Sequence, residues 1–260
     1  MKKTFLLSCL MLAAMPVMAA YTGHVYVDKN KNGVFDQSEK PLAGIKVSDG
    51  LNVVETAADG SFTLPGHERE RFIFITTPSG YKTFNRHYHK IEKKQSGYDF
   101  GLIPYSGRIR KDGSHRYIHI TDTEIFNTEN HADWVNNVRD YARNEQAAFI
   151  IHTGDICYEK GLKAHIKLMN TENMDCPVFY CIGNHDLVKG KYGEELFESI
   201  YGPVYYSFDA GNVHYVVTPM PGGDHAPGYT SDDVCRWLKN DLAHIPPGTP
   251  VVVLNHDLLT

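Results

Sequence analysis

The sequence predicts a small all-β sandwich followed by an α/β domain in which strands and helices alternate. At 260 residues, the chain is longer than one average domain. Its 42% hydrophobic and 22% charged residues are typical of a globular protein. Near residue 104, short alternating segments separated by turns give way to longer helical patterns. We therefore expect a β-sandwich module at 21–103 and an α/β domain at 104–260, after a separate segment at 1–20.

The first twenty residues have the pattern of a secretory signal peptide. Lys2 and Lys3 precede an apolar run over 5–17, and the small residues near Ala19 suit a cleavage site. A lipoprotein box ending at Cys9 is the alternative, although almost no apolar sequence lies ahead of it. We expect export to the periplasm or the cell exterior, and no transmembrane segment in the mature chain.

Charge limits the partners of the protein. The chain has 26 Lys and Arg against 31 Asp and Glu, which gives a formal net charge of −5. The basic residues form no stripe along the sequence, so general nucleic-acid binding through phosphate neutralisation is not expected. The sequence sets no oligomeric state.

Short strands and turn signals define the first unit. Strand-like runs lie at 23–27, 45–47, 53–56, 62–64 and 72–76. The dipeptides Asp49-Gly50 and Asp59-Gly60 lie between runs, and Asp-Gly flanked by alternating apolar residues is a strong hairpin signal. Because no helical stretch interrupts these runs, we predict a small antiparallel sandwich.

Longer elements alternate in the second unit. We predict strands at 117–121, 148–153, 177–182, 205–208, 213–218 and 251–254, and helices at 133–144, 159–169, 194–200 and 232–244. In the first helix, Trp134, Val138, Tyr141 and Ala142 recur at helical spacing. This alternation predicts a largely parallel sheet with helices on its faces, whose ligands gather at the carboxyl ends of the strands.

Polar clusters follow four of the predicted strands. They contain Asp122 with Glu124, then Asp155, then Asn184-His185-Asp186, and finally His256. Carboxylate, amide oxygen and imidazole are ligands suited to divalent ions such as Mn, Fe or Zn. Strand ends of a parallel sheet converge, so these side chains predict a metal site.

The order of these motifs resembles the calcineurin-like metallophosphoesterase family. An Asp, a Gly-Asp, a Gly-Asn-His-Asp and a His follow one another, and Gly-Asn-His-Asp after a strand is the most specific element. The likeness extends from about Tyr117 to the last residue. The first unit resembles the sandwich modules of secreted bacterial proteins, including those that precede some metallophosphoesterase domains.

The resemblance implies a phosphoesterase with two divalent metal ions and a small phosphorylated substrate, either a monoester or a diester. Asp122 would bind one ion, Asp155 would bridge both, and Asn184 with His256 would bind the second. His185 would act beside the metals on the phosphoryl group or the leaving oxygen, and Asp186 would orient its imidazole.

The sequence departs from the family pattern at two points. Glu124 stands where the family has a His, and we leave its role open between a metal ligand and a solvent-facing residue. The final Gly-His-x-His motif is absent, because the chain stops four residues after His256. We therefore expect a domain that is incomplete at its C-terminus. A catalytically decayed binding or scaffold protein of the same fold is the alternative to an enzyme.

A second metal signal lies in the first unit. The segment 28–39 matches the calcium-loop pattern D-x-[DN]-x-[DN]-G-x5-E in every specified position. The predicted oxygen ligands are Asp28, Asn30, Asn32, the carbonyl of Val34, Asp36 and Glu39. Because the flanks are predicted strands and not EF-hand helices, a polar hairpin loop is the alternative.

Overall fold

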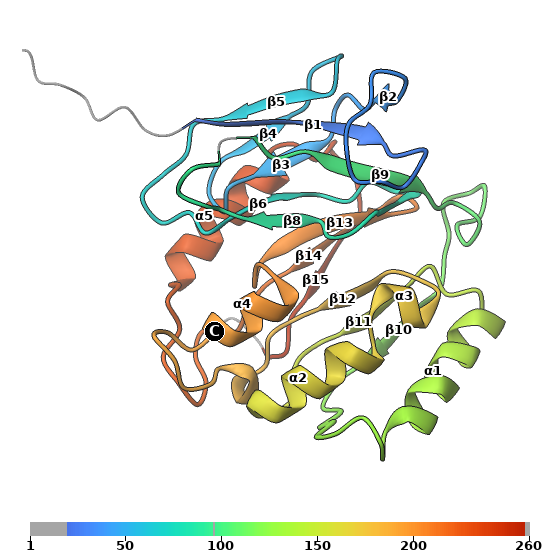
Figure 1. The fold of residues 1–260 in the computed structure, drawn as a ribbon, viewed down its shortest axis with the longest axis vertical. Coiled ribbons are helices and arrows are strands. Elements are labelled where there is room, and N and C mark those ends of the chain that lie inside the picture. Colours follow the sequence, from blue (N-terminus) through green and yellow to red (C-terminus); the bar gives the residue numbers. More distant parts are fainter. Residues whose placement is uncertain (1–19, 96, 258–260) are drawn as a thin grey trace, which may run out of the picture.

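The computed structural model describes residues 20–95 and 97–257 (Figure 1). Nearly all of the expected signal peptide, residues 1–19, lies outside the described residues. Within the described part, no helix is long and apolar enough to cross a membrane.

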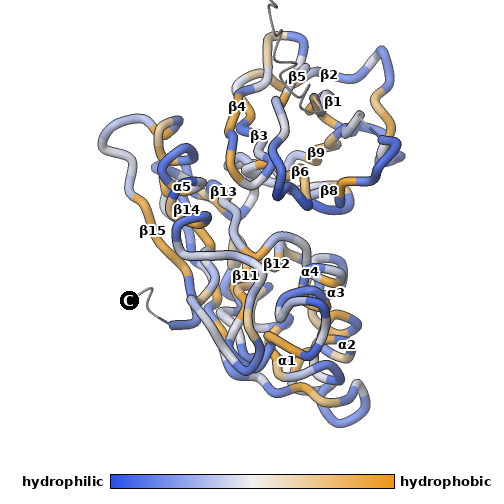
Figure 2. The backbone as a smooth tube through the Cα atoms, turned by 90° about the vertical axis from the view of Figure 1, so that its left-hand side faces the viewer, coloured by the Kyte–Doolittle hydropathy of each residue, from blue (hydrophilic) through white to orange (hydrophobic). Residues whose placement is uncertain are grey.

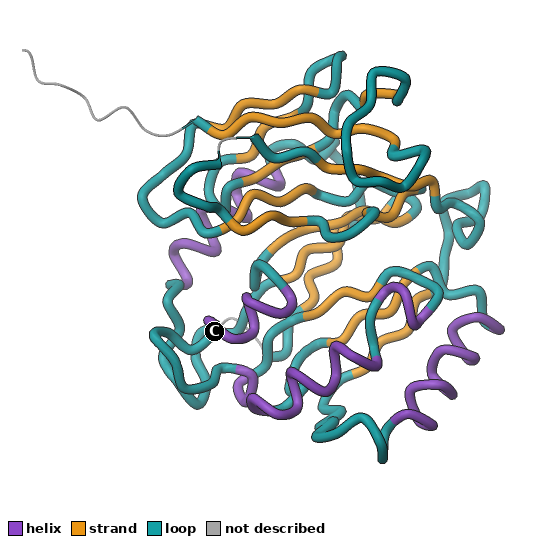
Figure 3. The backbone as a smooth tube through the Cα atoms, viewed as in Figure 1, coloured by secondary structure: helices purple, strands orange, loops and turns teal. Residues whose placement is uncertain are grey.

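The N-terminal module consists of two packed sheets and, within its described residues, contains only strands and loops (Figure 3). One sheet has the order β2 (Lys40–Pro41), β1 (Tyr21–Val27), β9 (Phe100–Pro104) and β7 (Tyr81–Thr83), with β5 (Ser61–Leu64) also paired to β1. The other has the order β4 (Val53–Glu55), β3 (Lys46–Ser48), β6 (Phe72–Ile75) and β8 (Tyr88–Lys90). All pairs are antiparallel except β1 with β9. The predicted sandwich is therefore confirmed, with one parallel pair added.

The α/β domain contains two sheets and not the single, largely parallel sheet that we predicted. The first is parallel and comprises β10 (Tyr117–Ile120), β11 (Phe149–His152) and β12 (Val178–Tyr180). The second comprises β13 (Tyr206–Ala210), β14 (Val213–Val217) and β15 (Val251–Leu254). In the second sheet β14 pairs with β15 in parallel, whereas β13 and β14 are antiparallel because the two-residue Gly211-Asn212 turn is too short to join parallel strands.

Helices cover one face of the parallel sheet, and the second sheet covers the other (Figure 1). The helices are α1 (Ala132–Asn144), α2 (Tyr158–Leu168), α3 (Thr171–Met174) and α4 (Glu195–Tyr201), while α5 (Ser231–Leu242) packs on the second sheet. Strand alternation explains the two cores: Ile150 packs with the helices, whereas its neighbours Phe149 and Ile151 face the second sheet. Strands β11 and β12 are thus buried on both faces, whereas the edge strand β10 is only partly buried.

Helix α1 forms where predicted, and two of its four expected core residues, Val138 and Ala142, pack toward the core. Val135 and Ala142 are buried, whereas Trp134 and Tyr141 are 41% and 60% exposed. Val135, which we did not predict to be buried, joins the buried face in place of the two aromatic side chains.

The module and the α/β domain share a hydrophobic core. Phe72, Phe74 and Tyr88 of the module belong to the same buried cluster as Phe149 and Phe208 of the α/β domain. A backbone bridge continues the contact, because the Asp209 N–H donates to the Thr77 carbonyl at 2.8 Å. Figure 2 shows the module lying beside β13 and α5. The change of composition near residue 104 is therefore not a break in packing.

Candidate metal centre and active site

Three strand ends bring together two carboxylates and one imidazole. Asp122 follows β10, Asp155 follows β11 and His256 follows β15, and one ligand atom from each lies within 4.8 Å of the others. Within this group, Asp155 Oδ2 and His256 Nε2 lie 3.5 Å apart. Asp155 is buried, whereas Asp122 is exposed. This donor set suits a divalent cation, which would offset the charge of the two carboxylates.

The tautomer of His256 also fits a metal ligand. Its Nδ1 lies 2.9 Å from the Thr153 carbonyl oxygen, which can only accept a hydrogen bond. Nδ1 therefore carries a proton, and Nε2 faces Asp155. Metal-binding histidines in proteins commonly donate their second N–H in this way.

Several residues of the site have a left-handed backbone. The φ angles are 52° at Asp122, 44° at Glu124, 52° at Asp155 and 89° at Cys157. Each such non-glycine residue costs on the order of 1–3 kcal/mol and persists only where the surroundings enforce it. Here the Asp122 N–H donates to the Gly154 carbonyl at 3.1 Å, which joins the two loops. The clustering of strain at these residues supports a functional site.

His152 forms hydrogen bonds with the loop that carries Asp122 and with the loop that carries Asp155. Its Nδ1 accepts the Gly154 N–H at 3.2 Å, so its Nε2 carries the proton and donates to Thr123 Oγ1 at 2.8 Å. Burial lowers the pKa of His152 well below its usual value, which keeps the ring neutral, as this arrangement requires. The only signal in the sequence for this role is the position of His152 just ahead of Thr153-Gly154-Asp155.

The Gly-Asn-His-Asp segment lies against Asp155. Asn184, His185 and Asp186 form a short 3-10 helix, η1 (Asn184–Asp186), and the His185 N–H donates to Asp155 Oδ1 at 3.1 Å. Gly183 allows this approach, because a Cβ there would lie 2.2 Å from the backbone nitrogen of Asp155. The motif therefore requires glycine at this position.

The imidazole of His185 is oriented by Asp224 and not, as we expected, by Asp186. His185 Nδ1 lies 2.9 Å from Asp224 Oδ2 and 3.3 Å from the Tyr158 hydroxyl. The hydrogen bond to Asp224 raises the pKa of His185. Its Nε2 faces Asp155 Oδ2 at 3.9 Å. The sequence does not reveal this partner, because Asp224 lies in a Gly-rich loop that has no regular spacing.

Asp186 instead holds the backbone of the site. Its two oxygens accept the N–H groups of Cys157 at 2.8 Å and Gly183 at 2.9 Å. The side chain is fully buried, and burial raises its pKa to about 6. Both oxygens are therefore used in joining the loop after β11 to the loop after β12.

Glu124 lies at the edge of the site. It is exposed, and its carboxylate accepts a hydrogen bond from the Cys157 thiol. The group formed by Asp122, Asp155 and His256 does not include it. Its role as a metal ligand stays a prediction.

The module contains a second compact group, formed by Asp49, His67 and Glu70. Its donor atoms already have protein partners: Asp49 Oδ1 accepts backbone N–H groups, and His67 Nε2 lies 3.1 Å from the Asp49 carbonyl. Glu70 contacts the Tyr21 hydroxyl and the His67 N–H. A metal ion would have to displace these contacts.

The predicted calcium loop connects β1 to β2 and turns carboxylates inward. Asp28 is buried and accepts the N–H groups of Asn32 and Gly33, while Glu39 is buried and accepts those of Lys29 and Asp36. The amides of Asn30 and Asn32 both contact Asp36 Oδ2. Gly33 has a φ of 73°, as the sharp turn requires.

Family models match both parts of the chain. Residues 115–260 match the model described as calcineurin-like phosphoesterase, and residues 29–104 match the model described as the N terminal of calcineurin-like phosphoesterase. No match was found among curated proteins. The fold and the candidate metal centre are those of a metal-dependent phosphoesterase. The chain belongs to the calcineurin-like phosphoesterase family, which confirms the resemblance seen in the sequence.

Proposed function

We propose that the protein hydrolyses phosphomonoesters or phosphodiesters at a dinuclear centre of Mn, Fe or Zn. The observation that carries this proposal is the convergence of Asp122, Asp155 and His256, with His185 beside them. Asp155 would bridge the ions, and Asn184 would complete the set. Bound divalent ions would neutralise phosphate charge and supply hydroxide near neutral pH.

Side chains of the protein would donate the proton and hold the catalytic groups in place. His185 presents Nε2 toward the metal centre, where it can donate a hydrogen bond to a phosphoryl oxygen or a proton to the leaving oxygen. Asp224 accepts from the opposite nitrogen and so fixes the direction of the ring. His152 and Asp186 hold the loops that carry the metal ligands.

The test compares 4-nitrophenyl phosphate with bis(4-nitrophenyl) phosphate in added Mn²⁺. We expect hydrolysis of at least one ester, its loss in Asp155→Asn and His185→Ala, and no loss in Asp59→Asn, which changes an exposed turn of the module. Hydrolysis that survives in Asp155→Asn would overturn the proposal. A metal-loaded wild-type protein that hydrolyses neither ester would favour the decayed binding protein.

We also propose that the protein is exported to the periplasm or the cell exterior. Support comes from the sequence of residues 1–20, with Lys2 and Lys3 ahead of an apolar run. N-terminal sequencing of the protein recovered from the periplasm or medium should begin near Ala20 or Tyr21. A lipid-modified Cys9 at the mature N-terminus would indicate the anchored alternative.

A third proposal is that the 28–39 loop binds calcium. The full motif match supports it, together with the inward carboxylates of Asp28 and Glu39. Calcium would replace hydrogen bonds within the loop and stabilise the module.

A further inference from the structure

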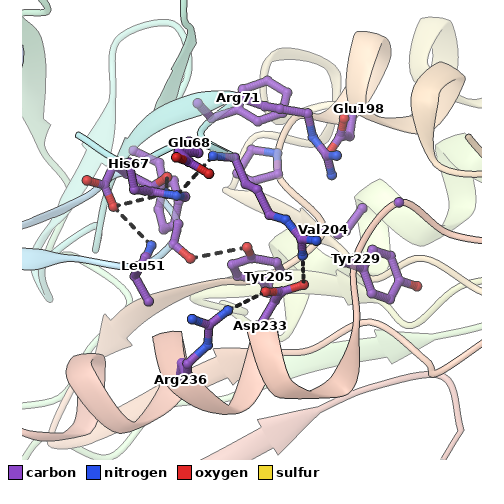
Figure 4. A pocket seen from close by; sticks show the side chains of 17 residues that line it. Leu51, His67, Glu68, Arg71, Glu198, Val204, Tyr205, Tyr229, Asp233 and Arg236 are labelled. Carbon is purple, nitrogen blue, oxygen red and sulfur yellow. Dashed lines mark hydrogen bonds and ion pairs between the residues drawn. The ribbon is translucent and has the colours of Figure 1, made fainter. Parts of the chain in front are cut away.

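One arginine of the module reaches a pair of buried carboxylates in the α/β domain. Arg71, just ahead of β6, places its guanidinium 2.8 Å from Glu194 Oε1 and 2.7 Å from Glu198 Oε1. Figure 4 shows Arg71 directed toward Glu198 at the wall of a cavity of about 630 Å³ between module and α/β domain. Both carboxylates are almost completely buried, so they depend on this cation for neutralisation.

Glu194 also holds the backbone of the loop that carries Asp224. We call residues 218–230, between β14 and α5, the Asp224 loop. The two oxygens of Glu194 accept the Gly228 N–H at 3.1 and 2.9 Å, and the same Oε1 receives Arg71. One carboxylate thus connects the module to the Asp224 loop.

The other end of this loop segment lies at the active site. The Asp224 N–H donates to the Asn184 carbonyl at 3.1 Å, and the Asp224 carboxylate accepts from His185. Between the two ends, the Gly193 N–H donates to the Ala226 carbonyl at 2.8 Å. Only three residues separate Asp224 from Gly228, and hydrogen bonds at both ends and at Ala226 hold this short segment.

We propose that Arg71 is a positioning residue for the active site: through Glu194 it fixes Gly228 and thereby holds Asp224 against His185. The N-terminal module then takes part in forming the catalytic geometry. Its effect on turnover rests on the proposed phosphoesterase function, whereas its effect on the Asp224 loop does not.

Hydrogen exchange tests the structural part without any need for activity. We expect Arg71→Met to speed exchange of amides at 224–228 by about tenfold or more, because the Gly228 N–H loses a fixed acceptor. Lys46→Met is the matched control, since Lys46 makes another ion pair between the module and the α/β domain, with Asp209 at 3.4 Å. It should leave this exchange unchanged.

Arg71→Lys covers the case in which Arg71→Met does not fold. A lysine keeps the charge but cannot hold Glu194 and Glu198 in the fixed fork of a guanidinium. It should increase exchange in the same peptide to a smaller extent. Wild-type exchange at 224–228 in whichever of the two variants folds would overturn the proposal.

Kinetics test the coupling to His185. Arg71→Met should lower kcat by about tenfold to a hundredfold with little change in KM, because a displaced Asp224 misdirects the imidazole. In an Asp224→Ala background the same change should have no further effect on kcat, since the two residues act along one path. Multiplicative losses would indicate a general structural effect and overturn the coupling. If the wild type has no activity but exchange responds as expected, the phosphoesterase proposal fails and the loop contact stands.

Discussion

His185 and Asp224 are 39 residues apart in the sequence, yet their side chains are joined by a contact of 2.9 Å between Nδ1 and Oδ2. The contact connects η1 to the Asp224 loop. Because it uses the ring nitrogen opposite the metal centre, it fixes the direction in which Nε2 points. The first prediction concerns this pair.

Removal of the Asp224 carboxylate should reduce turnover while the metal ligands stay in place. We expect Asp224→Ala to lower kcat by about tenfold to a hundredfold, because His185 loses its orientation. Asp224→Asn should lose less, since its amide oxygen can still accept from Nδ1. Asp232→Asn, on the exposed first turn of α5, is the control. Steady-state kinetics with metal analysis measure the effect, and full kcat in Asp224→Ala would contradict it.

A single methyl group at Gly183 should disrupt the metal centre. In Gly183→Ala the new Cβ would lie 2.2 Å from both the backbone nitrogen and Oδ1 of Asp155, so that residue must move. Calorimetric titration with Mn²⁺ should show weaker binding, by about tenfold or more, as for lost support of metal ligands. Gly107→Ala, where a Cβ meets nothing within 4 Å, should bind as the wild type does. Equal affinity in the two variants would mean that the loop adapts without moving Asp155.

Calcium should raise the melting temperature of the whole protein. At a hundredfold excess over Kd, a ligand adds about 2.7 kcal/mol to the free energy of unfolding. For a protein of this size, this corresponds to a rise of roughly 5–10 °C. Differential scanning calorimetry with calcium or chelator measures the change.

Two variants show whether such a rise comes from the 28–39 loop. Asp28→Ala should abolish the calcium-dependent rise, whereas Asp59→Ala, in another turn of the module, should retain it. Phosphoesterase activity should be largely unchanged in Asp28→Ala. A calcium effect that persists in Asp28→Ala would place the ion elsewhere, and identical curves with and without calcium would identify the loop as a polar hairpin.

Stability should fall above neutral pH because of a buried histidine between two carboxylates. His214 Nδ1 lies 2.6 Å from Asp209 and its Nε2 lies 2.8 Å from Asp241, so both ring nitrogens donate. Burial opposes the charged ring, but the hydrogen bonds to Asp209 and Asp241 outweigh it and raise the pKa of His214. The native state therefore keeps this proton to a higher pH than the unfolded state does. The resulting stabilisation is fully present below the unfolded value of 6.5 and is lost as pH rises through the folded pKa.

Urea unfolding at a series of pH values tests this sign. His214→Gln should cost about 3–5 kcal/mol at pH below 6.5, because Asp241 stays buried without its cation, and less at higher pH. His24→Gln is the control, since His24 pairs with Asp99 at the surface. A cost that is independent of pH would show that His214 is not charged in the native protein.

Local patterns in the sequence predicted most elements of the fold correctly. Short apolar runs between turn signals identified strands such as β6, and helical spacing located α1, because each pattern reflects contacts within one element. Four short strands of the module, β2, β7, β8 and β9, were not predicted. Pairing with distant strands defines them, as in the parallel contact of β9 with β1.

The same distinction applies to the candidate site. Asp122, Asp155 and His256 could be predicted to converge because each follows a strand, and the structure brings them together. The partner of His185 could not be predicted, since Asp224 reaches it from a loop whose path depends on tertiary contacts. The family resemblance implied that Asp186 orients His185, but neighbouring residues in a 3-10 helix point in different directions.

The aromatic residues that the module and the α/β domain share in one core have a consequence for gene recombination and for protein engineering. A gene that lost the segment encoding the module would leave Phe149 and Phe208 without the covering rings of Phe72, Phe74 and Tyr88. The module alone and the α/β domain alone would each expose a hydrophobic surface and tend to aggregate. Recombination cannot then exchange this module freely for an unrelated one, and a fusion partner is better attached ahead of Tyr21 than inserted near residue 104.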